Sequence, residues 1–532
     1  MALTIKQIIQ NIHLPTLLVC SGTIFSAPLF VLDKSEMICA KWAVMGMLIM
    51  MSLCAKSILQ KKFFVTNTDK VLKTFLLLGI IEIVIALLQL IKVLPSLNPY
   101  FRVTGSFDTP VSLAIMLSLC LPICVYYITQ AKQRHLFVWH LIITIFIFLL
   151  LVSECRTCII AGFCASFVVG CIRNRKIRSN ISKRKYINCA FICCILLLIV
   201  LYYYKRDSAD GRLLIWSVSA KMIAEKPLLG WGIDGFSSSY MSHQAAYFFQ
   251  YPGSKASYLA DNIPHPFNEV LLFAIKFGIL GTVLLLLFIS YLLYMLFKIN
   301  STYVVLYLGF IVTLIIQSMF FCPYKIPMVW LVSSFVVCSV ISKYCLIYAP
   351  KRRLIFSFLM LAIIGIIFQN KSSYKEWQWL RLKNSLSQPE NMYIEYSNLY
   401  HQLYSHPNFL YNYGAWLHYN GHYEESLKIL TECSDKYNDY NVEMLMADDY
   451  RQLGETNKAI ELFKYSNLMV PCRFLPLYYE MMIYVNERDS FNACRVAETI
   501  INKPKKIENS NSVRKIIHEA NEVFANFSEQ HR

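Results

Sequence analysis

The chain has 532 residues, and its composition excludes an ordinary soluble protein. Hydrophobic residues make up 56% of the chain and charged residues only 16%, whereas a water-exposed globular protein has about a quarter of its residues charged. Disorder requires low hydrophobicity and collagen requires far more than the 18 glycines present, so neither class fits. The composition therefore indicates an integral membrane protein.

Apolar runs long enough to cross ~30 Å of hydrocarbon, at ~20 residues each, recur along the first two thirds of the chain. The fold class predicted is all-α, a polytopic bundle of transmembrane helices. The first run is expected to be a retained signal anchor, because further runs follow at once. We expect about eleven spans, near residues 14–32, 37–59, 71–94, 108–128, 136–153, 157–172, 187–204, 269–297, 303–322, 324–347 and 354–370.

The formal net charge of +18 comes from basic residues that gather in alternate loops, most densely between residues 173 and 185. A topology signal that also meets anionic lipid head groups explains this pattern better than nucleic-acid binding. The positive-inside rule then places these loops and the N-terminus in the cytoplasm. With eleven crossings the C-terminus lies on the other side, so we expect a multi-pass bacterial inner-membrane protein with residues 205–268 and the C-terminal part in the periplasm.

After residue 370 the composition becomes polar, and a period near 33–34 residues emerges. The clearest unit has small and aromatic residues at tetratricopeptide spacing, namely Ala447, Tyr450, Leu453, Gly454, Ala459, Phe463 and Pro471. Such a helical repeat either docks a protein partner or only caps the membrane part. The predicted organisation is spans one to seven in 1–204, a periplasmic loop in 205–268, spans eight to eleven in 269–370 and a tetratricopeptide-like domain in 371–532.

Two motifs suggest cofactor or metal chemistry that the surrounding sequence does not support. Residues 230–235 satisfy the glycine pattern of dinucleotide sites, but they follow a helical segment and no strand precedes them. We expect a tight turn there, where backbone approaches a ligand or a neighbouring helix. Cys155 and Cys158 have no second cysteine pair for zinc. We therefore expect no cofactor and no metal; the pairing of Cys433, Cys472 and Cys494 stays open.

Cations on the outer side are the residues that the topology rule leaves unexplained. Arg102, Arg156 and Arg212 are expected there, and guanidinium groups match phosphate oxygens well. Residues 210–226 predict an amphipathic helix on the outer membrane surface, with Leu213, Trp216, Ala220 and Ile223 on one face. His265 precedes the eighth span and is a candidate base near neutral pH. A structural ion pair is the alternative for each arginine.

Glu82 lies at the centre of the third predicted span, where a carboxylate is costly. A functional carboxylate is one interpretation. A neutral side chain or a structural partner on a neighbouring helix is favoured over it.

Five segments, in this order along the chain, resemble the O-antigen ligase and polymerase superfamily, which includes the bacterial protein O-oligosaccharyltransferases. The resemblance covers residues 100–345 approximately. It rests on Gly105-Ser106-Phe107-Asp108-Thr109-Pro110, Ser153-Glu154-Cys155-Arg156-Thr157, Gly211-Arg212 with Trp216 and Pro227-Leu228-Leu229-Gly230-Trp231-Gly232, His265 with Asn268, and Phe277-Gly278-Ile279-Leu280-Gly281.

The resemblance implies metal-independent transfer of a glycan from an undecaprenyl-diphosphate carrier to an acceptor hydroxyl. His265, Arg212 and Arg156 would be catalytic. The substrate-binding set would be Arg102, Trp216, Gly230, Trp231, Gly232 and Asn268. The acceptor stays open between a lipid A core sugar, a Ser or Thr of an exported protein and the end of a growing polymer. A polysaccharide transporter or flippase is the alternative from another class.

Overall fold

The computed structural model describes residues 68–173, 203, 206–299, 301–348, 375–383, 389–506 and 510–528, and within them it contains helices and no strands. This confirms the all-helical prediction for that part of the chain. The chain divides into two compact units, Met1–Leu201 with Leu284–Leu380 and Tyr202–Val283 with Arg381–Arg532. The predicted spans 14–32, 37–59, 187–204 and 354–370 lie outside the described residues, apart from Tyr203.

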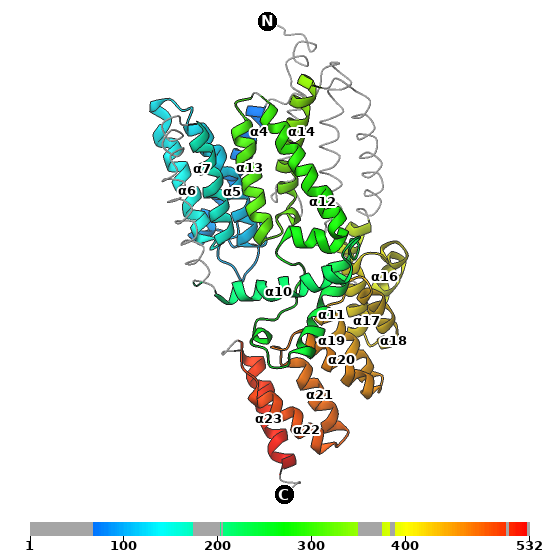
Figure 1. Ribbon diagram of the computed structural model, residues 1–532. Helices are drawn as coiled ribbons and strands as arrows, with labels where there is room; N and C mark the ends of the chain where they lie inside the picture. Colours follow the sequence, from blue (N-terminus) through cyan, green and yellow to red (C-terminus); the bar gives the residue numbers. More distant parts are fainter. Residues whose placement is uncertain are drawn as a thin grey trace. The chain divides into compact units, whose positions relative to one another are not determined.

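The first unit is a bundle of apolar helices in which α5 contacts four others. Its helices are α4 (Thr68–Leu90), α5 (Pro110–Ile128), α6 (Leu136–Val152), α7 (Arg156–Arg173), α13 (Val304–Phe320) and α14 (Pro327–Tyr348). Small residues let the backbones approach, as is common between membrane helices. A methyl group on Gly309 of α13 would lie 2.9 Å from Val169 of α7, and one on Gly162 would lie 3.3 Å from Ser118. Figure 1 shows these apolar helices side by side.

Among the described residues, four helices are long and apolar enough to cross a membrane, namely α4, α5, α7 and α12 (Glu269–Lys298). Shorter apolar helices follow at Leu136–Val152, Val304–Phe320 and Met328–Ile341. These positions agree with predicted spans three to six and eight to ten. The interruption at Glu154 and Arg156 is the turn between α6 and α7, where Glu154 has a φ of 52°. The total of eleven spans stays a prediction.

Two polar side chains of α4 fix the chain that leads into α5. Glu82 is 1% exposed, and its carboxylate accepts a bond from the backbone N–H of Ser106 at 2.9 Å and another from the Ser106 hydroxyl. Gln89 donates to the carbonyl of Gly105 at 2.8 Å and accepts from the N–H of Thr104 at 3.0 Å. Glu82 therefore has a structural partner in the segment that leads into α5.

The second unit combines α10 (Arg206–Glu225), α11 (Gly235–Gln250), the start of α12 and the C-terminal helices. These last are α16 (Pro389–Leu403), α17 (Pro407–Tyr419), α18 (Tyr423–Ser434), α19 (Tyr440–Gln452), α20 (Thr456–Met469), α21 (Leu475–Asn486), α22 (Ser490–Asn502) and α23 (Asn511–Ser528). One core runs through both parts, because Val218 and Phe236 belong to the same buried cluster as Phe463. The predicted loop domain and C-terminal domain thus share one hydrophobic core.

The C-terminal helices pack in sequence, each against the next, as Figure 1 shows from α17 to α23. Turns with positive φ at Gly421 and Gly454 separate the members of two helix pairs. Gly414 lies against Leu430, where a methyl group would come within 2.6 Å. The starts of successive helix pairs, at α17, α19 and α21, are separated by close to the predicted period. Their tetratricopeptide character stays a prediction. Cys433, Cys472 and Cys494 are free thiols.

Glu443 on α19 is a buried carboxyl inside this unit. Burial, opposed by a hydrogen bond from Asn438 and reinforced by the charge of Asp439, raises its pKa from the usual 4.5 to about 7. The folded unit therefore binds a proton that the unfolded chain has already released at intermediate pH. Stability present below pH 4.5 is lost as the pH rises to about 7.

We predict that Glu443→Gln removes this part of the pH dependence, because the amide stays neutral at every pH. Between pH 5 and pH 8 the melting temperature of the purified full chain should fall by at least about 2 °C more in the wild type than in Glu443→Gln. Glu461→Gln, at an exposed position of α20, is the control and should behave as the wild type. Equal pH dependence in the wild type and Glu443→Gln would contradict the assignment.

Candidate functional site

The second unit contains a break in α12. Gly278 has φ 67° and ψ −170°, so the helical hydrogen-bond ladder is interrupted there. Residues 227–232 fill the gap: the N–H of Trp231 donates to the carbonyl of Ile275 at 2.7 Å, and the N–H of Gly232 to that of Lys276 at 3.0 Å. In the other direction, the N–H of Ile279 donates to the carbonyl of Pro227 at 2.7 Å. Backbone groups in an apolar helix must be paired, and this loop pairs them.

Both sides of this contact require glycine. A methyl group on Gly230, where φ is +73°, would lie 2.5 Å from the Ile275 carbonyl oxygen. One on Gly278 would lie 2.1 Å from the Leu228 carbonyl oxygen. The two backbones therefore touch without an intervening side chain. The turn predicted at 230–235 is confirmed for Gly230, and the neighbour it approaches is a helix.

Two tryptophans tie α10 to the flanking segments. The indole N–H of Trp231 donates to the carbonyl of Met222 at 2.8 Å, and that of Trp216 donates to the carbonyl of Pro266 at 3.0 Å. The Lys226 ammonium lies 3.8 Å from the centre of the Trp231 ring, within the range of a cation–π interaction. Trp216 and Trp231 thus have structural contacts in addition to the substrate-binding role predicted for them.

Arg212 and His265 come together on the ring of Phe267. The Arg212 guanidinium carbon lies 5.9 Å from the centre of that ring, and the His265 imidazole centre lies 4.4 Å from it. Phe267 itself has a φ of +51°, which turns the chain between His265 and α12. The His265 Nε2 atom is buried. The Arg212 guanidinium and the His265 imidazole therefore both lie close to the Phe267 ring.

Asn268 follows directly and caps α12. Its side-chain oxygen accepts the N–H groups of Val270 at 2.9 Å and Leu271 at 3.1 Å, which satisfies the first donors of the helix. The side chain is 6% exposed. This contact fixes the end of the segment that carries His265, and the substrate-binding role of Asn268 stays a prediction.

Arg102 and Arg156 belong to the first unit. Arg102 is exposed and donates to the carbonyl of Leu90, the last residue of α4, at 3.0 Å. Arg156 is the half-buried first residue of α7. The structure therefore brings Arg212, Trp216, His265 and Asn268 together, and it describes the other two arginines in a separate compact unit.

Helix α10 has a second apolar face that the sequence analysis missed. Leu214, Val218 and Met222 are buried in the core, whereas Leu213 on the predicted face is 54% exposed. The helix also begins at Arg206, before the predicted start. On the predicted face, Trp216 and Ile223 are partly buried against the core and Leu213 is exposed. The buried face contacts α11 and belongs to a core that includes residues of the C-terminal helices.

Phe267 was also missed, and its signal in the sequence was weak. A phenylalanine beside a proline is ordinary in a loop. Only the structure shows that Phe267 turns the chain before α12 with a positive φ. Gly278, by contrast, belongs to the Phe277–Gly281 motif, and a glycine inside an apolar helix often marks a break or a close approach. Within the described ranges no group of three His, Cys, Asp or Glu side chains could hold a metal ion.

Residues 111–286 match the family model described as O-Antigen ligase. This match supports the resemblance of the chain to the O-antigen ligase superfamily. It runs from α5 into α12 and includes Arg156, Arg212, His265 and the break at Gly278. No curated protein matches the chain. The match and the apolar helices indicate a membrane protein with a glycosyltransferase-type role as a ligase or polymerase in lipopolysaccharide biosynthesis.

We predict that Gly278→Ala disrupts the docked loop far more than Gly232→Ala. Alanine at 278 meets the Leu228 carbonyl and occupies a backbone region that is almost confined to glycine, at a cost above about 3 kcal/mol. Gly232 also has a positive φ, but a methyl group there meets nothing within 4 Å, so only about 1–2 kcal/mol is expected. The melting temperature of each purified variant measures the difference. Equal melting temperatures would show that the contact at Gly278 is not essential.

Proposed function

We propose that this protein is a membrane glycosyltransferase that transfers a glycan from an undecaprenyl-diphosphate carrier to an acceptor hydroxyl on the periplasmic face of the inner membrane. The observation that supports it best is the pairing of Arg212 and His265 on the Phe267 ring. Both residues lie in the segment that matches the ligase family model. Arg212 supplies a permanent positive charge, and His265 supplies a base suited to neutral pH.

The proposed reaction is a substitution at the anomeric carbon of the donor glycan. His265 accepts the proton of the acceptor hydroxyl while the acceptor oxygen forms the new glycosidic bond. The bond between the anomeric carbon and the diphosphate oxygen breaks, and its electron pair leaves with undecaprenyl diphosphate. Arg212 hydrogen-bonds the phosphate oxygens and stabilises the charge that develops on them. Phe267 would hold both side chains in register for these steps.

Arg156 and Arg102 are proposed to contribute further positive charge to the diphosphate, as the family resemblance implies. Trp216, Gly230, Trp231, Gly232 and Asn268 would then shape the substrate site through the backbone contacts described above. The acceptor is a lipid A core sugar, a protein Ser or Thr, or the end of a growing polymer. The last of these would make the protein a polymerase of the same superfamily, with the same bond-making chemistry.

We predict that Arg212→Ala and His265→Ala each lower glycan transfer by at least about 100-fold. The assay gives the purified full chain a lipid-diphosphate glycan and candidate acceptors, and it measures released undecaprenyl diphosphate together with the new glycosidic bond. His401→Ala and Arg495→Ala, exposed on α16 and α22, should keep wild-type transfer.

Two results would contradict the proposal. Wild-type transfer by well-expressed His265→Ala would remove the base assignment. Movement of the lipid-linked glycan across the membrane without bond cleavage would instead indicate a transporter.

A further inference from the structure

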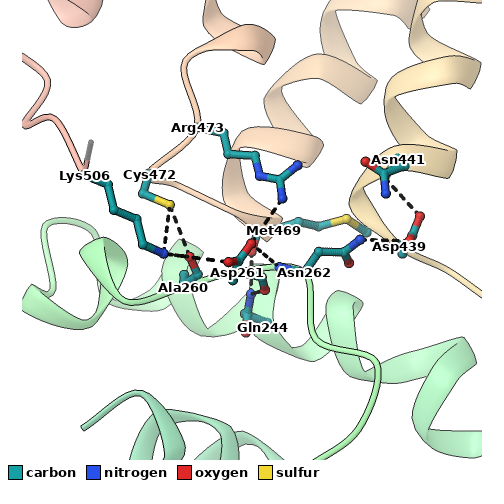
Figure 2. A network of polar contacts seen from close by, with 10 residues as sticks. All are labelled: Gln244, Ala260, Asp261, Asn262, Asp439, Asn441, Met469, Cys472, Arg473 and Lys506. Atoms are coloured by element: carbon teal, nitrogen blue, oxygen red, sulfur yellow. Dashed lines mark hydrogen bonds and ion pairs between the residues drawn. The ribbon is translucent and has the colours of Figure 1, made fainter. Parts of the chain in front are cut away.

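The segment that carries His265 is held at both ends. Downstream, Pro266 is bound by Trp216 and Asn268 caps α12. Upstream, residues 260–262 contact the C-terminal helices at several points, which Figure 2 draws together. Only Ile263 and Pro264 separate this upstream anchor from His265.

Gln244 is the buried residue at the centre of the upstream anchor, which is the set of contacts made by residues 260–262. It lies on α11 and is 0% exposed. Its amide nitrogen donates to the carbonyl of Asp261 at 3.1 Å and to the carbonyl of Met469, at the end of α20, at 2.6 Å. Its oxygen accepts from the Tyr240 hydroxyl at 2.9 Å. One side chain thus connects the His265 segment to the C-terminal helices, and a buried amide leaves its partners unpaired when removed.

Charged and polar side chains from the connections between the C-terminal helices add further contacts to residues 260–262. Arg473 approaches the Asp261 carboxylate at 3.1 Å, and Lys506 lies 3.8 Å from its other oxygen. The amide of Asn262 donates to the Asp439 carboxylate at 2.8 Å. The Cys472 thiol contacts the carbonyl of Ala260 at 3.1 Å. Figure 2 shows Arg473 and Lys506 pointing toward Asp261 from two different segments.

We propose that Gln244 and Arg473 are positioning residues for the reaction, and that the C-terminal helices hold His265 in place through residues 260–262. The C-terminal part would then be a component of the site, in addition to binding a partner or shielding the membrane part. The kinetic part rests on the proposed function, because it takes His265 as the base. A shift of a reacting group by about 1 Å lowers rates by up to about 100-fold, so the anchor should act on turnover more than on donor binding.

The chain offers a matched control for Arg473. Arg473 pairs with Asp261 and lies 4.4 Å from the centre of the Tyr440 ring. Arg451 likewise pairs with a carboxylate, that of Asp448, at 2.6 Å, and lies 5.5 Å from the centre of the Tyr479 ring. Its side chain is 30% exposed, against 38% for Arg473. Both of its contacts are within the C-terminal helices, however, and neither touches residues 259–268. The two arginines therefore differ in one respect: Arg473 contacts the segment that leads to His265, and Arg451 contacts only residues of the C-terminal helices.

The test uses the full chain in lipid nanodiscs, with Gln244→Leu, Arg473→Gln, Arg473→Lys and Arg451→Gln. Gln244→Leu should lower kcat by about tenfold or more and Arg473→Gln by about 3- to 10-fold, with KM for the donor changed by less than about threefold. Arg473→Lys should keep about half of the activity or more, because lysine still pairs with Asp261. Arg451→Gln should match the wild type.

Hydrogen exchange of residues 259–268 gives a second readout that does not depend on activity. It should accelerate in Gln244→Leu and Arg473→Gln and stay unchanged in Arg451→Gln. Unchanged kcat despite faster exchange would overturn the positioning role, and so would equal loss of kcat in Arg473→Gln and Arg451→Gln. If the wild type transfers no glycan, the proposed function fails; faster exchange still supports the anchor, and unchanged exchange overturns it.

Discussion

The pairing of backbone groups at the break in α12 is the constraint on which the site depends. An apolar helix that is long enough to cross a membrane cannot leave N–H and C=O groups unpaired in hydrocarbon. At Gly278 the helix interrupts its own ladder, and residues 227–232 supply the missing partners. The loop between α10 and α11 is thereby fixed to the helix that follows His265, and its two close glycine contacts leave little freedom of position.

Other contacts of the second unit connect the docked loop to the candidate residues. Trp231 connects the docked loop to the end of α10, and Trp216 connects α10 to Pro266. Arg212 near the start of α10 then lies over the Phe267 ring, which the His265 ring also contacts. The C-terminal helices share the same core and contact residues 260–262. A cation and an imidazole from distant parts of the sequence are held together by backbone carbonyls, tryptophan N–H groups and one aromatic ring.

The sequence predicts the apolar helices well and the connections between them poorly. Hydropathy located α4 to α7 and α12 to α14, because burial in lipid requires a long apolar run whatever the neighbours are. The distribution of charges and the family resemblance single out Arg212 and His265. The sequence could not show the second buried face of α10, since Leu214, Val218 and Met222 belong to a core to which α11 and helices far along the chain also contribute. Nor could it show Phe267 or the contacts of Gln244, which depend on tertiary packing and have no local pattern.

The most direct test of the account is an experimental structure of the full chain in a lipid nanodisc with undecaprenyl diphosphate bound. The account predicts that a phosphate oxygen lies within hydrogen-bond distance of the Arg212 guanidinium and that the His265 imidazole borders the same pocket. A diphosphate bound away from Arg212, or a site that opens toward the cytoplasm, would contradict it.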